Sequence, residues 1–238
     1  MFTAITNAFR VKEIRKKILF TLFVLIVYRI GAWITVPGVN AAALAQISST
    51  GLASILNTFS GGGLSNYSLF AMGVSPYITA QIVVQLLQMD IVPKFVEWSK
   101  QGEVGRQKLN QATRWLTIVL GFVQSIGITA GFNTLSSIKL VQHPTVTTYL
   151  TIGLILTAGT MFATWLGDMI TERGVGNGVS MLIFAGIIAQ MPSGIAQLWN
   201  DQIASESGSQ LWMGIGFIVC VVIALLIIVA FVTWVQQA

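Results

Sequence analysis

The sequence predicts an all-α, polytopic membrane protein with six transmembrane helices. Hydrophobic residues make up 54% of its 238 residues and charged residues only 9%, whereas soluble domains carry about 25% charged residues. Apolar runs recur along the chain, and several approach the roughly 20 helical residues that cross a hydrocarbon core about 30 Å thick. The lysines and arginines gather in alternate connections between these runs. This pattern is typical of a chain that crosses a bilayer repeatedly.

The first predicted transmembrane helix covers residues 18–36, after a basic, amphipathic segment at 1–17 that we expect to lie at the membrane interface. The run is long for the core of a signal peptide and no small-residue cleavage site precedes Pro37, so we expect it to remain uncleaved. Arg29 lies in its second half, where a cation costs about 2.5–3.5 kcal/mol. We favour snorkelling of Arg29 to the far interface over a role with a partner helix.

Residues 59–89 form the stretch around which we expect the chain to be organised. Two apolar pieces, 64–74 and 77–89, are separated by Ser75-Pro76, and neither is long enough to cross a bilayer alone. Irregular backbone at membrane depth survives only inside protein or beside a water-filled cavity. We therefore expect this stretch to line a cavity.

The second apolar piece carries two different stripes. Ile78 and Ile82 lie one helical turn apart, and Gln81, Gln85 and Gln88 share a neighbouring face at the same kind of spacing. One helix is therefore expected to present both an aliphatic and an amide surface.

The remaining predicted spans are 115–132, 149–166, 179–198 and 211–235. The first of them carries Gly121, Gly127 and Gly131, and the second is rich in small residues, which predicts close helix contacts. The last run is apolar all round, so we expect much of it to face lipid.

The charge distribution predicts the orientation. We expect connections 37–58, 133–148 and 199–210 on the far side of the membrane, and 90–111 and 167–178 as solvated loops on the near side. Of the 13 lysines and arginines, only Arg29 and Lys139 fall outside the near side. Because positive loops stay inside, the N-terminus is predicted to be cytoplasmic.

Several kinds of chemistry are disfavoured. Cys220 and His143 are the only cysteine and histidine, so the sequence predicts no metal site and no cofactor. The glycine-rich residues 174–178 lie between two membrane spans and not in an α/β unit, so we interpret them as a tight turn in which Asn-Gly supplies positive φ, and not as a nucleotide loop. No intramembrane protease signature is present, so we do not expect an enzyme.

Two functions remain in contest, a conducting channel and an ion-coupled solute transporter, because transporters also use broken helices. The break here is flanked by glycine and aliphatic residues, whereas a solute site would show convergent charged or hydroxyl groups. Ile183 and Ile187 repeat the spacing of Ile78 and Ile82 on another helix. Such pairs alone are more often core packing, but an aliphatic collar can also gate a pore by dewetting.

Longer motifs carry a family resemblance. They are Tyr28-Arg29-Ile30-Gly31 with Val36-Pro37-Gly38, residues 57–62 (NTFSGG), Pro76-Tyr77-Ile78-Thr79-Ala80, Gln85-Leu86-Leu87, residues 98–106 (WSKQGEVGR) and residues 174–180 (GVGNGVS). In these motifs the whole chain resembles the N-terminal half of the SecY family, the central subunit of the Sec protein-conducting channel. The resemblance implies ten helices in two pseudo-symmetric halves, a plug, an aliphatic pore ring and a lateral gate towards lipid.

The resemblance also implies roles for particular residues. The plug would comprise Ser60, Gly61, Gly62, Gly63, Leu64, Ser65, Asn66, Tyr67, Ser68, Leu69, Phe70, Ala71, Met72 and Gly73, with a short helix. The pore ring would include Ile78, Ile82, Ile183 and Ile187, and Gln85 and Gln124 would belong to the polar cluster of the lateral gate. Residues 18–198 would form the N-terminal half of the channel, and 199–238 an external loop and the sixth helix.

The function implied is transport of unfolded secretory polypeptides across the bacterial plasma membrane and release of apolar segments into its lipid. Implied partners are SecE-type and SecG-type small membrane subunits, the SecA motor or a ribosome, signal peptides and translocating polypeptides. Six crossings supply only the first half and the sixth helix. We therefore expect a fragment that is inactive without the C-terminal half of the channel.

Overall fold

The computed structural model describes residues 11–40, 57, 60–89, 91–135, 140–141, 144–199, 223–224 and 226–236. Within these residues the fold is helical, and the only β pairings are two isolated bridges, Thr35 with Ser68 and Val39 with Val141. The chain divides into two compact units, Met1–Ala189 and Gln190–Ala238. The first unit contains every residue of the site described below.

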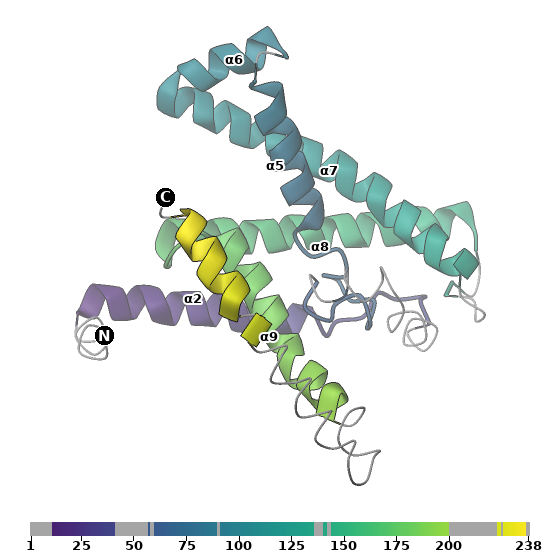
Figure 1. The fold of residues 1–238 in the computed structure, drawn as a ribbon. Coiled ribbons are helices and arrows are strands. Elements are labelled where there is room, and N and C mark those ends of the chain that lie inside the picture. The colour runs from purple at the N-terminus through teal and green to yellow at the C-terminus, as the bar shows by residue number, and fades with distance from the viewer. Residues whose placement is uncertain are drawn as a thin grey trace. The chain divides into compact units, whose positions relative to one another are not determined.

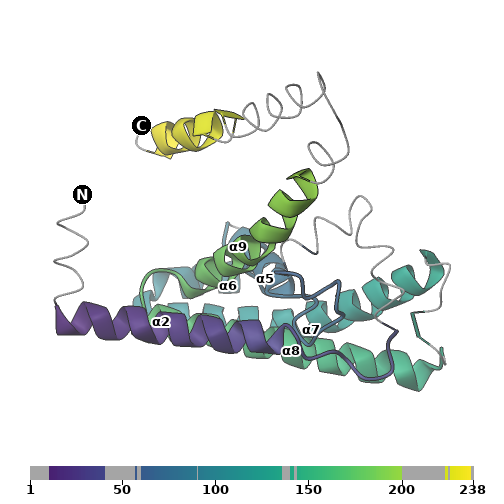
Figure 2. The ribbon, with the colours of Figure 1, turned by 90° about the horizontal axis from the view of Figure 1, so that it is seen from below.

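The helices are α2 (Lys12–Gly31), α5 (Ser75–Leu87), α6 (Pro93–Lys100), α7 (Gly102–Leu135), α8 (Val146–Arg173) and α9 (Gly178–Trp199) (Figure 1). The all-α prediction is confirmed. The most extensive contacts join α7 to α8 and α5 to α7. Helix α2 packs along α8 (Figure 2).

Two described helices, Gly102–Thr134 and Val146–Arg173, are long and apolar enough to cross a membrane, and Gly178–Gly194 and Leu226–Gln236 are shorter apolar helices. The number of six crossings stays a prediction, because residues 1–10 and 200–222 lie outside the described part of the chain. The apolar side chains at 226–229 are exposed within the second unit, and the lipid-facing surface expected for the last run stays a prediction.

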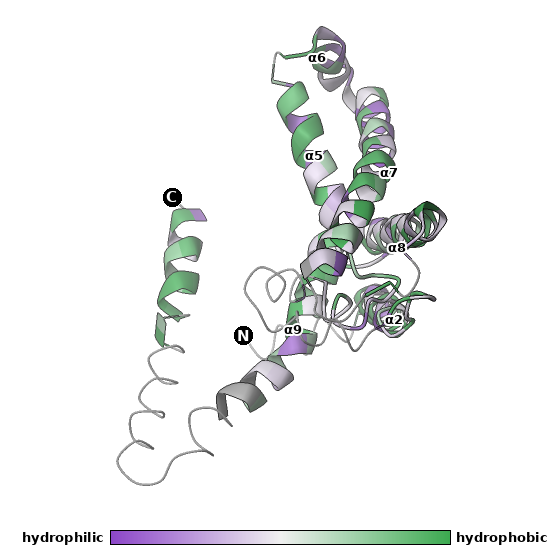
Figure 3. Ribbon diagram, turned by 90° about the vertical axis from the view of Figure 1, so that its right-hand side faces the viewer, coloured by the Kyte–Doolittle hydropathy of each residue, from purple (hydrophilic) through white to green (hydrophobic). Residues whose placement is uncertain are grey.

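The expected loop at 90–111 is wrong in its described part. Residues 93–100 form α6, and α7 begins at Gly102, where a φ of +64° makes the turn between the two helices. At Gly105 a Cβ would lie 1.7 Å from the Trp98 carbonyl oxygen, so only glycine permits this close packing of α6 on α7. Figure 3 shows hydrophobic residues over most of α5 and hydrophilic residues in α6. The basic connection is therefore helical in its described part, with residues 93–100 in α6 and residues 102–111 in the first turns of α7.

The first predicted span also ends early. Helix α2 stops at Gly31, and the next residues are extended because Ile34 and Val36 hydrogen-bond to the backbone of residues 67–69. Backbone groups that hydrogen-bond to another segment cannot also make the bonds that would continue the helix. The span predicted for 18–36 is thus a helix only to Gly31.

Helices α7 and α8 pack through small and hydroxyl residues. Gly153 lies against Phe122 and Ile126, and Gly121 lies against Thr157, as the small-residue pattern predicted. At Gly127 and Gly131, however, a Cβ would meet nothing within 4 Å, so the predicted close contact is wrong there. The buried threonines of this interface donate mainly to carbonyls one turn back in their own helices.

Two buried apolar clusters form the core of the first unit, and residues 60–74 contribute to both. Leu64, Tyr67 and Met72 belong to one cluster, and Phe70 and Val74 to the other. The segment between α2 and α5 is therefore the centre of the packing.

Candidate functional site: a buried segment beside an apolar cavity

Residues 60–74 form consecutive turns, so the short helix expected within 60–73 is wrong. Gly61, Gly62 and Gly73 have φ values of +65°, +84° and +53°, and Tyr67 has a φ of +43°. A right-handed helix cannot contain such residues. Turn hydrogen bonds replace it, for example from the Ser68 amide to the Gly63 carbonyl at 2.8 Å.

The chain that follows α2 holds this segment by backbone pairing. The Val36 amide donates to the Tyr67 carbonyl at 2.9 Å, and the Leu69 amide donates to the Ile34 carbonyl at 2.8 Å. These bonds satisfy backbone groups that would otherwise be buried without partners. Residues 67–69 are thereby fixed to the end of α2.

Phe70 anchors the segment between α2 and α8. Its ring stacks on Tyr28 of α2, with centroids 4.9 Å apart, and on Phe162 of α8 at 6.0 Å. The ring rests on Gly31, where a Cβ would lie 2.2 Å from the Phe70 Cε2 atom. Stacked aromatic pairs contribute about 0.5–1.5 kcal/mol beyond their buried area.

Contacts with α7 and α8 complete the packing around residues 60–74. The hydroxyls of Tyr67 and Thr129 are hydrogen-bonded to each other in the interior. On α8, a Cβ at Gly159 would lie 1.9 Å from the Leu69 carbonyl oxygen, so backbone meets backbone there. The segment is therefore enclosed by helices and does not lie flat on the surface of the bundle.

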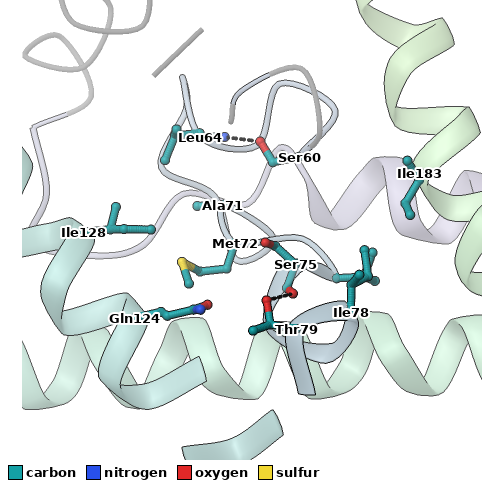
Figure 4. A pocket seen from close by; sticks show the side chains of 11 residues that line it. Ser60, Leu64, Ala71, Met72, Ser75, Ile78, Thr79, Gln124, Ile128 and Ile183 are labelled. Atoms are coloured by element: carbon teal, nitrogen blue, oxygen red, sulfur yellow. Dashed lines mark hydrogen bonds between the residues drawn. The ribbon is translucent and has the colours of Figure 1, made fainter. Parts of the chain in front are cut away.

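A cavity of about 520 Å³ adjoins this segment. Its lining is mostly aliphatic and comprises Ser60, Leu64, Ala71, Met72, Val74, Ser75, Ile78, Thr79, Gln124, Ile128 and Ile183. In Figure 4 the α7 residues Gln124 and Ile128 lie on one side, Ile183 of α9 on the other, and residues 60–75 between them. The prediction that residues 59–89 line a cavity is confirmed for its first part, since the lining residues of this stretch lie between Ser60 and Thr79.

The predicted ring and gate residues divide into two groups. Ile78 and Ile183 line the cavity, as does Gln124. Ile82 and Ile187 lie one turn further along the same helices with 51% and 37% of their surface exposed, and Gln85 is also exposed. The structure thus brings one isoleucine from each pair to the cavity, together with one of the two glutamines.

Arg29 is hydrogen-bonded within the bundle, and its snorkelling to the interface stays a prediction. Its guanidinium donates a hydrogen bond of 2.5 Å to the Gly61 carbonyl, and the residue is half-buried. A cation at this depth needs acceptors, and the turn at Gly61 presents a carbonyl that no helix uses.

The turn expected at residues 174–178 is confirmed, with the positive φ of +75° at Gly176 and not at Asn-Gly. Asn177 Oδ1 accepts from the Ser180 amide at 3.2 Å and so caps α9. The Val175 amide donates to Thr21 of α2 at 3.1 Å. This turn is a structural link between α8, α9 and α2.

Sequence reasoning missed some cavity residues. Ile128 was not expected, although it lies one turn after Gln124 and helical spacing could have found it. The role of Phe70 against Gly31 had no signal in the sequence, because the two positions are far apart in the chain.

These features define a class: a helical membrane protein in which a buried, turn-rich segment borders an aliphatic cavity between helices. The profile of the SecY family matches residues 68–238. The chain belongs to the SecY family.

Curated relatives agree over the whole chain. It is 61% identical to protein translocase subunit SecY 1 of Lactobacillus kefiranofaciens subsp. kefiranofaciens and 54% identical to protein translocase subunit SecY of Bacillus subtilis (strain 168), each over 238 residues. These alignments cover 100% of this chain and 55% of each relative. The chain therefore spans about half the length of the curated relatives it matches.

Two solved structures share the fold. One is a structure of a protein-conducting channel and the other is Sec61 in a canine ribosome–channel complex from the endoplasmic reticulum. Each has a TM-score of 0.54 and 19% sequence identity, over 79% of this chain and 38% of the other. At this identity the likeness establishes the fold alone.

Proposed function

We propose that the chain forms the N-terminal half of a protein-conducting channel subunit, which moves unfolded secretory polypeptides across a bacterial plasma membrane and releases apolar segments sideways into lipid. The observation that carries this proposal is the buried segment 60–73 beside a cavity walled by Ile78 and Ile183. A displaceable segment next to an aliphatic constriction suits a channel for polypeptides whose side chains vary widely in size and polarity.

In this proposal residues 60–73 are the plug, and Ile78, Ile82, Ile183 and Ile187 contribute to the pore ring. Gln85 and Gln124 belong to the lateral gate. Amide pairs hold such a gate only weakly, since membrane side-chain hydrogen bonds average about 0.6 kcal/mol. A signal peptide could therefore displace them.

The proposed partners follow from the family and from the greater length of its curated members. The C-terminal half of the same channel would complete the ring, and SecE-type and SecG-type subunits would bind alongside. A SecA motor or a ribosome would drive the polypeptide. The canine relative of similar fold was solved with a ribosome, which supports the second possibility.

We place the N-terminus and the connection at α6 in the cytoplasm. Polar groups gather at this end: Lys16, Lys17 and Arg173 border a second cavity, and Arg114 pairs with Asp168 at 2.6 Å. Both features join the last turns of α8 to basic residues of α2 and α7, in accord with the positive-inside rule, although Glu13 also lines the second cavity.

The test is crosslinking in the complete channel. A photo-reactive residue at Ile78 or Ile183 should crosslink to an arrested translocating chain, because both side chains line the cavity. Phe23, which is 63% exposed on α2, supplies the matched control and should crosslink to lipid. Efficient crosslinking at Phe23 but none at the two isoleucines would contradict the proposal, as would saturable, ion-coupled uptake of a small solute.

A further inference from the structure

The buried segment has two halves that are held differently. Its rear half, residues 67–74, is fixed to three helices by the backbone pairs with Ile34 and Val36, by the Phe70 stack and by the Tyr67–Thr129 hydrogen bond. Several independent contacts would have to break together to release it.

The front half, residues 60–66, is bonded to itself, to Asn57 and to the first residues of the rear half, because the Leu64 and Gly63 carbonyls accept from the Tyr67 and Ser68 amides at 3.0 and 2.8 Å. The Leu64 amide donates to Ser60 Oγ at 3.1 Å, and the Gly62 and Ser65 amides donate to Asn57 oxygens at 2.9 Å each. These bonds travel with the segment if it moves. They do not tie it to a helix of the bundle.

Among the described residues, Arg29 makes the hydrogen bond that joins the front half to a bundle helix, at 2.5 Å to the Gly61 carbonyl. The other contacts of the front half are apolar. A Cβ on Gly61 would lie 2.8 Å from Gly186 Cα on α9, and the Leu64 side chain is buried in the cluster that includes Phe132 and Ile152. The described residues offer Arg29 no carboxylate partner. The Gly61 carbonyl is therefore the acceptor that stabilises the half-buried guanidinium, and the guanidinium in turn satisfies this carbonyl.

We infer that Arg29 is a latch: its hydrogen bond to Gly61 holds the front half closed, and opening swings residues 60–66 away while residues 67–74 stay on α2. This inference rests on the proposed function, because it describes how the plug of that channel is retained. Arg29 acts as a positioning residue and need not touch the passenger.

The experiment measures thiol labelling in the complete channel without a passenger, with Cys220→Ser as background. Leu64→Cys reports on the front half and Ala71→Cys on the rear half, since both residues are buried and line the same cavity. Each is labelled with a small maleimide in the presence and absence of Arg29→Met. Arg15→Met, on the exposed part of the same helix, is the matched control.

We expect Arg29→Met to raise labelling at Leu64→Cys about tenfold, the effect of one charged hydrogen bond, and to leave Ala71→Cys within about twofold. Arg29→Lys should restore much of the protection, because an ammonium also donates. Equal increases in labelling at both thiols would contradict the division of the segment into two differently held halves. No increase at Leu64→Cys would overturn the latch.

A second variant guards against a folding defect in Arg29→Met. Gly61→Ala leaves Arg29 in place but forces a Cβ towards Gly186 at a φ of +65°, so it should also expose Leu64→Cys and spare Ala71→Cys. Crosslinking of a passenger at Ile183 in the unaltered channel is scored separately. If that crosslink forms while labelling is unchanged, the latch fails and the proposed function stands.

Discussion

At the scale of single residues, the tightest constraint on the buried segment is the backbone contact at Gly159. Leu69 approaches α8 so closely that no side chain fits between them. We predict that Gly159→Ala lowers the free energy of unfolding by about 1–3 kcal/mol, the usual cost of overpacking. Thermal unfolding of the complete channel in detergent measures it.

Gly127 on α7 provides the matched control for that variant. A Cβ there meets nothing within 4 Å, and alanine is favoured over glycine in a helix by about 0.5–1 kcal/mol. Gly127→Ala should therefore be neutral or slightly stabilising. Equal destabilisation by both variants would show that the contact with Leu69 is not the cause.

A second residue-scale prediction concerns the ion pair between Arg114 and Asp168. The two side chains are 54% and 28% exposed, so water screens their attraction and a surface pair contributes about 0–1 kcal/mol. Asp168→Asn should change the unfolding temperature by no more than a few degrees. A loss as large as that of Gly159→Ala would mean that the pair is buried in the complete protein.

At the scale of elements, the segment 60–73 is predicted to be the seal. Deleting it from the complete channel should raise ion conductance in planar bilayers, because the cavity would lose the wall formed by Leu64, Ala71 and Met72. Export should persist, since Ile78 and Ile183 remain. The control is Asn66→Ala, which changes an exposed residue within the segment and should leave conductance unaltered. If the deletion also left conductance unaltered, the segment would not be the plug.

The helices were predictable because the length and apolar character of a run are local properties of the sequence. The cavity beside residues 59–89 was predictable too, because the length of each apolar piece and the proline break are read directly from the sequence. The turns within 60–73 were not, since an apolar run such as 64–74 suits a helix until tertiary packing imposes positive φ at Tyr67. Helix α6 was missed because the charged residues at 90–111 were interpreted as a solvated loop.

Arg29 shows a different limit. Its position in an apolar run was visible, but its partner, the Gly61 carbonyl, lies 32 residues away. Backbone acceptors leave no mark in a sequence, so snorkelling was the more economical interpretation. Pairings between distant segments, here and at Phe70 with Gly31, required the structure.

At the scale of the whole molecule, the four predicted ring isoleucines differ in their surroundings. Ile78 and Ile183 face the cavity, whereas Ile82 and Ile187 remain exposed on the same helices. The curated relatives are nearly twice as long as this chain. Under the proposed function, the additional length would cover these exposed isoleucines and close the ring.

The orientation gives the last prediction, made for the complete channel with Cys220→Ser. Helix α7 has 34 residues and extends about 50 Å, enough to place Ser99 of α6 and Val146 at the start of α8 on opposite sides of a membrane. A membrane-impermeant maleimide should label Val146→Cys in intact cells and Ser99→Cys only after permeabilisation. Both side chains are exposed, so access and not burial decides the result. Labelling of both thiols from outside would mean that α7 does not cross, and the cytoplasmic assignment of the basic connection would fail with it.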